Sequence, residues 1–172
     1  MSEQASLITY PYNRDAAVAY ALKWAYSRNP AFYDFEDLGG DCTNFASQCL
    51  LAGGALMNFT PTYGWYYRNL NDRAPAWTSV EYLYRFLTTN EGVGPFGHEV
   101  DLPFIRPGDI IQLMTVENRF HHSPIVVKTG ILPTLNNTLV AAHSYDARNR
   151  PLSTYNIKAM RCIHIDGLRK WA

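Results

Sequence analysis

The 172-residue sequence has no net charge, few cysteines and no long hydrophobic run. Its 15 basic and 15 acidic residues cancel, and neither sign gathers in a block of five or more. This balance does not predict a nucleic-acid surface. No run approaches the roughly 18 uncharged apolar residues that cross a bilayer, and residues 1–30 lack a basic start followed by an apolar segment. We expect a soluble protein, either cytoplasmic or secreted after removal of a leader.

The three cysteines are too few for a disulfide scaffold, and an odd number leaves at least one thiol unpaired within the monomer. If Cys42 and Cys49 share a helix, they lie about 10 Å apart, beyond the ~7 Å limit for a disulfide. No Cys-x-x-Cys or His-x-x-x-His spacing occurs, and the adjacent His121 and His122 would point to opposite sides of a strand. We therefore expect neither a local disulfide nor a metal site.

The length and a hydrophobic content of 47% predict a single domain over residues 1–172. Apolar residues three and four apart predict an amphipathic helix over residues 13–29. Thr78 and Glu81 have the spacing of a capping box and predict the start of another helix. Aliphatic segments after the turn ArgProGlyAsp predict strands over residues 110–114, 122–128, 139–145 and 159–165. Helices followed by strands indicate an α+β domain with its helices packed on an antiparallel sheet.

The segment GGDCTNFASQCLLAGG, residues 39–54, predicts a helix between two glycine pairs, with Asp41 as its cap and Cys42 at its start. A thiol at the first turn of a helix feels the partial positive charge of unpaired N–H groups, which lowers its pKa and favours the thiolate. The same N–H groups could hold an oxyanion. The alternative is a small, inert, buried side chain, which is our interpretation of Cys49 and Cys162.

The stretch FHHSPIVVK supplies two candidate bases for a nucleophilic cysteine. Strand alternation puts His121 on the more aliphatic face, so we expect it to be buried and bonded to a backbone carbonyl, with His122 on the other face. A third group must orient the imidazole of the base. If TLVAAHSYD forms a hairpin with this strand, His143 falls within a residue or two of His122. Asp146 and Asn149 remain alternatives, because the register is not fixed by the sequence.

Several of these segments together resemble a known family. In order, they are YNRDAAVAYALKWA, GGDCTNFASQCLLAGG, WYY, PGDIIQLM, HHSPIVV and AAHSYDARNRPL. They are similar to the putative amidase domain family of bacterial, papain-like cysteine hydrolases related to NlpC-type and CHAP cell-wall enzymes. The resemblance covers residues 12–152, and GDCTNF is its most specific part.

The resemblance implies a papain-like α+β fold in which the cysteine-bearing helix packs on an antiparallel sheet of about five strands. It implies that Cys42 is the nucleophile, that His122 is the general base and then the general acid, and that His143 orients His122. Such an enzyme cleaves an amide through a thioester acyl-enzyme and requires no metal or organic cofactor.

The resemblance also implies a peptide or amide substrate, most plausibly a stem peptide of the bacterial cell wall. A cytoplasmic role on imported wall peptides or on another small amide is open as well. Two alternatives are an acyltransferase that uses the same Cys/His pair and a non-catalytic binding module. The presence of Cys42, His122 and a polar third residue argues against a binding module, which needs none of them.

Four further residues are candidates for contact with substrate. Asp41 and Asn44 flank the nucleophile and either bind substrate or brace the turn. We place the capping role of Asp41 first, because an inward carboxylate would oppose the thiolate. Trp65 and Tyr66 belong to the aromatic-rich segment 57–77 and would wall the cleft, although such residues are more often core.

Overall fold

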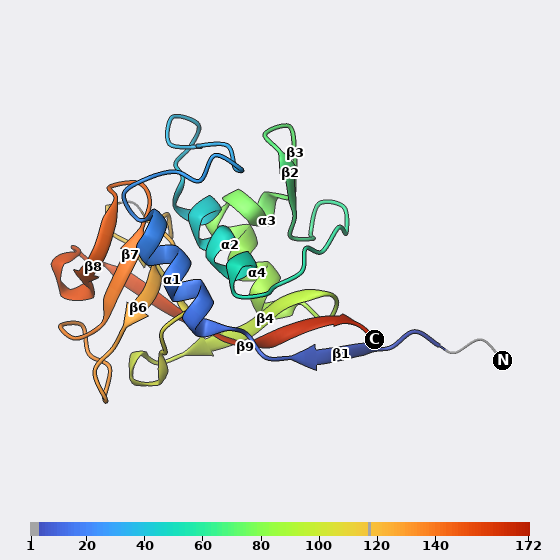
Figure 1. Cartoon of the computed structure of the whole chain (residues 1–172). Helices are drawn as coiled ribbons and strands as arrows, with labels where there is room; N and C mark the ends of the chain where they lie inside the picture. Colours follow the sequence, from blue (N-terminus) through green and yellow to red (C-terminus); the bar gives the residue numbers. More distant parts are fainter. Residues whose placement is uncertain (1–3, 117) are drawn as a thin grey trace.

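The computed structural model describes residues 4–116 and 118–172 as a sheet with its helices on one side (Figure 1). The helices are α1 (Arg14–Trp24), α2 (Cys42–Ala52), α3 (Pro75–Thr78) and α4 (Val80–Thr89), with short 3₁₀ turns η1 (Leu102–Phe104) and η2 (Leu152–Thr154). Within the described residues, none of the helices has the length and apolar character needed to cross a bilayer.

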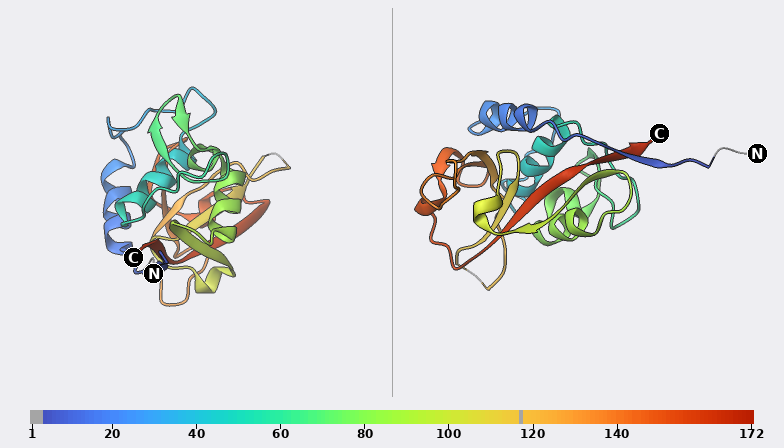
Figure 2. Two further views of the ribbon diagram at one scale, coloured as in Figure 1. Left: turned by 90° about the vertical axis from the view of Figure 1, so that its right-hand side faces the viewer. Right: turned by 90° about the horizontal axis from the view of Figure 1, so that it is seen from below.

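Seven strands of the described chain form one sheet in the order β1-β9-β5-β6-β7-β8, with β4 also paired to β9. They are β1 (Leu7–Tyr10), β4 (Gly94–Val100), β5 (Ile110–Met114), β6 (Ile125–Lys128), β7 (Leu139–Ala142), β8 (Ala147–Pro151) and β9 (Ala159–Trp171). Every pairing is antiparallel. Seen from below, β9 runs the length of the molecule and lies beside β1 near both chain ends (Figure 2).

The first two helices begin and end close to where the sequence predicts. Asn13 caps α1 by accepting a hydrogen bond from the backbone N–H of Ala16 at 3.0 Å. The second helix begins at Cys42 and ends before Gly53, whose backbone N–H donates to the carbonyl of Cys49 at 3.0 Å. Cys42 therefore occupies the first turn of α2, where N–H groups lack helical partners.

The α+β class is confirmed, and three finer predictions are wrong. The sheet has seven described strands rather than about five, because the flanking segments β1 and β4 both pair with β9. Thr78 and Glu81 do not form a capping box: Thr78 ends α3, and its hydroxyl accepts from Arg73 at 3.1 Å. The excursion over residues 57–77 also contains a small hairpin, β2 (Tyr67–Asn69) with β3 (Asp72–Arg73).

The sheet is covered differently on its two faces. On one face, α1 and α2 pack on β6 and β7 through a cluster that includes Phe45, Cys49, Ile125 and Ala141. On the other face, side chains from residues near η1 and η2 cover Ile111, Val126 and Val140. Alternation along β6 produces this division, because successive side chains point to opposite faces. The start of α2 thus lies beside one end of β6 and β7. At this end, His122 precedes β6 and His143 follows β7.

Candidate active site

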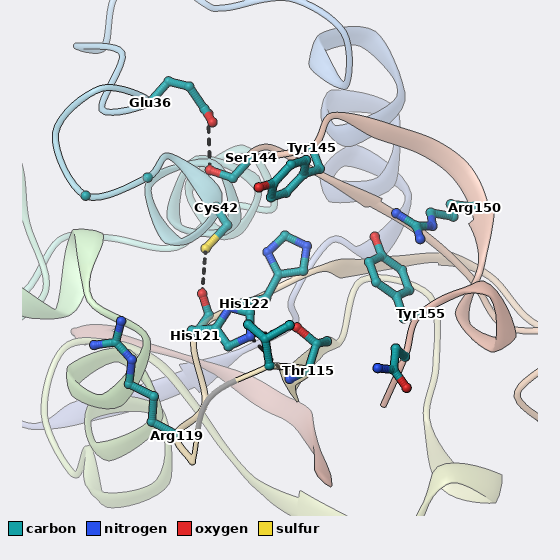
Figure 3. Close-up of a pocket in the computed structure, with 14 residues that line it drawn as sticks. Glu36, Cys42, Thr115, Arg119, His121, His122, Ser144, Tyr145, Arg150 and Tyr155 are labelled. Atoms are coloured by element: carbon teal, nitrogen blue, oxygen red, sulfur yellow. Dashed lines mark hydrogen bonds between the residues drawn. The ribbon is translucent and has the colours of Figure 1, made fainter. Parts of the chain in front are cut away.

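Cys42 and His122 open into one pocket of about 680 Å³ (Figure 3). Both side chains are largely buried, each with 7% of its surface exposed. The pocket is formed where the start of α2, the segment before β6 and the segments on either side of β8 meet. Its walls include Glu36, His121, Ser144, Tyr145, Arg150 and Tyr155. The structure thus brings Cys42 and His122, two residues singled out in the sequence, to one pocket.

The thiol of Cys42 donates to the backbone carbonyl of His121 at 3.7 Å (Figure 3). Burial raises the pKa of the Cys42 thiol, and hydrogen bonds from Thr43 and the backbone of Ser123 oppose the rise only in part. The sequence predicted a lowered pKa from the helix terminus alone. In the packed protein, desolvation of the thiolate acts in the opposite direction, because burial disfavours the charged form. Burial therefore favours the neutral form of the Cys42 thiol.

His122 is suited to accept that proton. Burial, together with charge repulsion from the nearby His121 and Arg150, lowers the pKa of His122 to about 4. The imidazole is consequently neutral over the physiological pH range, with one bare nitrogen. Its ring nitrogens make no hydrogen bond within residues 4–116 and 118–172, although its backbone carbonyl accepts from the N–H of Leu113 at 3.0 Å. A neutral thiol and a neutral imidazole therefore face the same pocket.

His121 lines the same pocket in a different hydrogen-bonding state. Its Nε2 atom accepts from the backbone N–H of Thr115 at 3.2 Å and lies 2.8 Å from the Thr115 hydroxyl. The sequence predicted a backbone carbonyl as its partner. The segment before β6 folds back on the end of β5 instead, so the ring meets an N–H and a hydroxyl. These contacts occupy one ring nitrogen of His121, whereas neither ring nitrogen of His122 is hydrogen-bonded within the described residues.

His143 lies close in the sheet but has other partners. The hairpin of β6 and β7 is confirmed, with Ile125 opposite Ala141. Extending this register by two residues places His143 opposite Ser123, on the face of the sheet that packs against α2. Its ring stacks on Phe45 with centroids 3.9 Å apart. Nδ1 bonds to Asp41 at 2.5 Å and Nε2 to the carbonyl of Trp24 at 2.8 Å, so neither nitrogen is directed at His122.

Asp41, which precedes Cys42, is fully buried and does not line the pocket. Besides His143, its carboxylate accepts from the backbone N–H of Phe35 and from Asn44, both at 2.8 Å. It makes no side-chain cap at the start of α2, although it stands at the N-cap position. The predicted capping role is therefore wrong. The carboxylate instead fixes the loop that leads into Cys42.

With this geometry described, comparison with known proteins becomes informative. The sequence model of the putative amidase domain matches residues 11–165. The chain belongs to this family. It is also 34% identical over 146 residues to the uncharacterized protein YhbB of Bacillus subtilis (strain 168), a match that covers 82% of this chain and 44% of that protein. The chain thus spans less than half the length of this curated relative. No solved structure gives a significant match.

Membership of the amidase family favours hydrolysis of a C–N bond. In this family member, Asn44 is buried, donates to the carbonyl of Tyr33 at 2.9 Å, and accepts from the indole of Trp77 at 2.8 Å. Trp65 is fully buried in the core, and its indole donates to Ser47 at 3.0 Å. Tyr66 packs beside Phe59 with ring centroids 5.3 Å apart. Asp41, Asn44, Trp65 and Tyr66 are not among the described residues that line the pocket.

The two alternatives to His143 lie elsewhere: Asp146 is paired with another residue, and Asn149 is exposed. Asp146 forms a two-pronged ion pair with Arg28, at 2.9 and 3.0 Å. Asn149 is exposed on β8 and has a positive φ of 52°. The structure therefore directs none of the three predicted orienting residues at His122.

The amidase pocket contains several residues that sequence reasoning missed. Ser144 follows β7 and accepts from the backbone N–H of Asp41 at 2.9 Å, while its hydroxyl donates to Glu36 at 3.1 Å. Ser144 and Tyr145 have positive φ values of 58° and 61°, which L-residues rarely adopt. Tyr145 is 91% exposed at the pocket wall. The HSYD motif offered a signal for this turn, but its left-handed conformation cannot be read from the sequence.

Proposed function

We propose that this protein is a cysteine-dependent hydrolase that cleaves an amide or peptide bond through a thioester, with Cys42 as the nucleophile and His122 as the base. One observation carries the proposal: a thiol at the first turn of α2 and an available neutral imidazole open into the same pocket. Family membership supports the choice of a C–N bond. We further propose that the fold is related to the papain-like NlpC and CHAP enzymes.

The reaction begins from a neutral pair. The Cys42 sulfur attacks the amide carbonyl carbon, a C–S bond forms, and the thiol proton passes to the bare nitrogen of His122. The raised pKa of the thiol makes a resting thiolate unfavourable, so proton transfer accompanies the attack. The lowered pKa of His122 makes the imidazolium short-lived and a strong acid. That acidity suits its second task, which is to protonate the leaving nitrogen.

The carbonyl oxygen becomes an oxyanion during the attack. Backbone N–H groups at the start of α2 are positioned to hold it, because the first turn of a helix has N–H groups without helical partners. Collapse of the tetrahedral intermediate breaks the C–N bond, and His122 gives its proton to the departing amine. Water then attacks the thioester with His122 again as base, which releases the acid and restores the thiol.

We propose a peptide substrate of the cell-wall stem type, on the resemblance to cell-wall enzymes. The pocket of about 680 Å³ lies within the usual size range for small-molecule sites and accommodates a short peptide. Transfer of the acyl group to an amine or alcohol would use the same Cys42 thioester. The test must therefore separate hydrolysis from transfer.

The test offers the protein synthetic stem peptides and follows release of new amino groups by mass spectrometry. Hydrolysis is expected for the wild type and for the matched control Cys49→Ala, because Cys49 is buried between α2 and the sheet. Cys42→Ala is expected to be inactive but folded. Added hydroxylamine should divert the thioester to a hydroxamate: its nitrogen attacks the carbonyl, and the C–S bond breaks. Equal turnover by Cys42→Ala would refute the cysteine mechanism, and binding without turnover would favour the binding module.

A further inference from the structure

His122 needs a partner on the nitrogen that does not face Cys42. A neutral imidazole carries one N–H and one bare nitrogen, and only the tautomer with its bare nitrogen toward the thiol can act as the base. An acceptor on the far side of the ring selects that tautomer and stabilises the imidazolium that forms later. His143 and Asp146 are bonded to other residues, and Asn149 is exposed on β8, so none of the three is directed at His122.

Tyr155 stands on that side of the ring. Figure 3 draws the His122 imidazole between the Cys42 thiol and the Tyr155 side chain. The two rings are 5.8 Å apart between centroids and inclined by 50°, so the phenol ring lies next to the imidazole. The phenol oxygen is buried and receives no well-aligned hydrogen bond from the described residues, although the Arg150 guanidinium is near enough to lower the pKa of Tyr155. A buried hydroxyl without a partner is unfavourable, so this one requires an explanation.

The surroundings hold the Tyr155 ring in place. The Arg150 guanidinium lies over the ring, with its central carbon 3.6 Å from the ring centroid. Arg150 is itself fixed by hydrogen bonds to the Thr154 hydroxyl at 2.8 Å and the Thr154 carbonyl at 3.1 Å. Burial raises the pKa of Tyr155, and the charge and hydrogen bond of Arg150 oppose this rise only in part; the negative charge of a Cys42 thiolate would raise it further. The group beside His122 is therefore a rigid, neutral phenol.

We propose that Tyr155 is the positioning residue of the active site: its oxygen accepts a hydrogen bond from the His122 N–H that faces away from Cys42. This inference rests on the proposed function of Cys42 and His122. It gives Tyr155 the role that the sequence assigned to His143. Arg150 acts one step further out, because it holds the phenol and opposes a long-lived charge on His122.

The experiment compares Tyr155→Phe with a matched control, Tyr12→Phe. Both changes remove one buried hydroxyl, but the Tyr12 hydroxyl donates to the carbonyl of Gly108 at 2.9 Å, far from the pocket. Tyr155→Phe is expected to keep or raise the melting temperature and to lower kcat at least about tenfold with KM unchanged. Tyr12→Phe is expected to do the reverse, with a lower melting temperature and an unchanged kcat.

A second measurement needs no substrate. Nitrogen-15 NMR of the imidazoles reports the tautomer of each histidine, and the His122 signals are assigned by their absence in His122→Gln. The wild type and Tyr12→Phe should show one His122 tautomer, and Tyr155→Phe a mixture of two. The same tautomer in Tyr155→Phe and the wild type would overturn the inference even if Cys42 proves essential. Loss of the proposed function alone would instead appear as unchanged amide hydrolysis in Cys42→Ala.

Discussion

Two buried histidines, His143 and His122, lie near the same end of the β6–β7 hairpin and differ in almost every contact. Both ring nitrogens of His143 are hydrogen-bonded, and its ring stacks on Phe45. The ring of His122 has no hydrogen bond within the described residues and borders a pocket. The comparison separates two uses of one residue type: His143 fixes the loop before the nucleophile, and His122 keeps its nitrogens for chemistry.

The contrast has a physical basis. A buried polar network whose members are all satisfied contributes rigidity, whereas a buried polar group without a partner lowers stability. Proteins tolerate the second condition mainly where function requires it. Variants of His143 and its hydrogen-bond partners should therefore lower the stability of the fold. Variants of His122 and its pocket neighbours should change reactivity.

The largest effect is expected for Asp41, which is a hydrogen-bond partner of His143. Asp41→Ala removes the acceptor of three buried donors, from Phe35, Asn44 and His143. We expect the free energy of unfolding to fall by about 3–5 kcal/mol in urea titrations. Asp146→Ala is the control, because its ion pair with Arg28 is partly exposed and worth at most about 1 kcal/mol. If Asp41→Ala loses no more unfolding free energy than Asp146→Ala, the buried network around His143 does not stabilise the fold as proposed.

The next effect is a pH dependence that comes from His122. Its pKa is about 4 in the folded protein, below the ~6.5 of an unfolded chain, so the unfolded state binds the proton more tightly. The neutral form contributes its full stability above pH 6.5, and this is lost as the pH falls toward 4, by about 3 kcal/mol. His122→Gln should lack this part of the acid destabilisation. Parallel pH curves for the variant and the wild type would contradict the lowered pKa.

A smaller effect is expected for His143→Ala. The variant loses the stacked ring on Phe45 and removes one hydrogen bond each from Asp41 and the Trp24 carbonyl. We expect about 2 kcal/mol less stability and a fall in kcat of less than about tenfold. His122→Ala should show the opposite balance, with turnover lost and the fold kept. Loss of turnover in His143→Ala without a change in melting temperature would restore the orienting role predicted from the sequence.

The smallest effect is expected at the turn of Ser144 and Tyr145, which borders the pocket. Tyr145 has a positive φ of 61° and is 91% exposed, so its backbone is strained and its side chain adds little packing. Asparagine tolerates this conformation better, and Tyr145→Asn should raise the free energy of unfolding by at most about 1 kcal/mol. Tyr145→Phe keeps the strain and serves as the control. A destabilised Tyr145→Asn would show that the ring packs more than its exposure indicates.

Local signals predicted much of this fold. Spacing and glycine pairs located α1 and α2, and aliphatic segments located β5 and the β6–β7 hairpin. The edge strands β1 and β4 escaped prediction because they take their shape from pairing with β9 rather than from their own pattern. Tertiary context decided the capping box as well, since Thr78 bonds to Arg73.

The site was predicted only in part, for similar reasons. The first turn of α2 identified Cys42 from local features alone. The face on which His143 lies depends on the β6–β7 register, which changes between Val126 and Lys128 and leaves no signature in the sequence. Burial of the thiol, which reversed the expected direction of its pKa shift, is likewise a property of the packed protein. Tyr155 follows η2, far along the chain from His122, and no spacing rule connects them.

The central claim is that His122 activates Cys42, and alkylation tests it most directly. The rate of iodoacetamide modification at Cys42, Cys49 and Cys162 would be followed by mass spectrometry from acid to alkaline pH, in the wild type and in His122→Gln. The account predicts that Cys42 reacts fastest, that its rate falls below about pH 4 where His122 becomes protonated, and that His122→Gln slows Cys42 alone. Equal rates at Cys42 in the two proteins, rising only at alkaline pH, would contradict it.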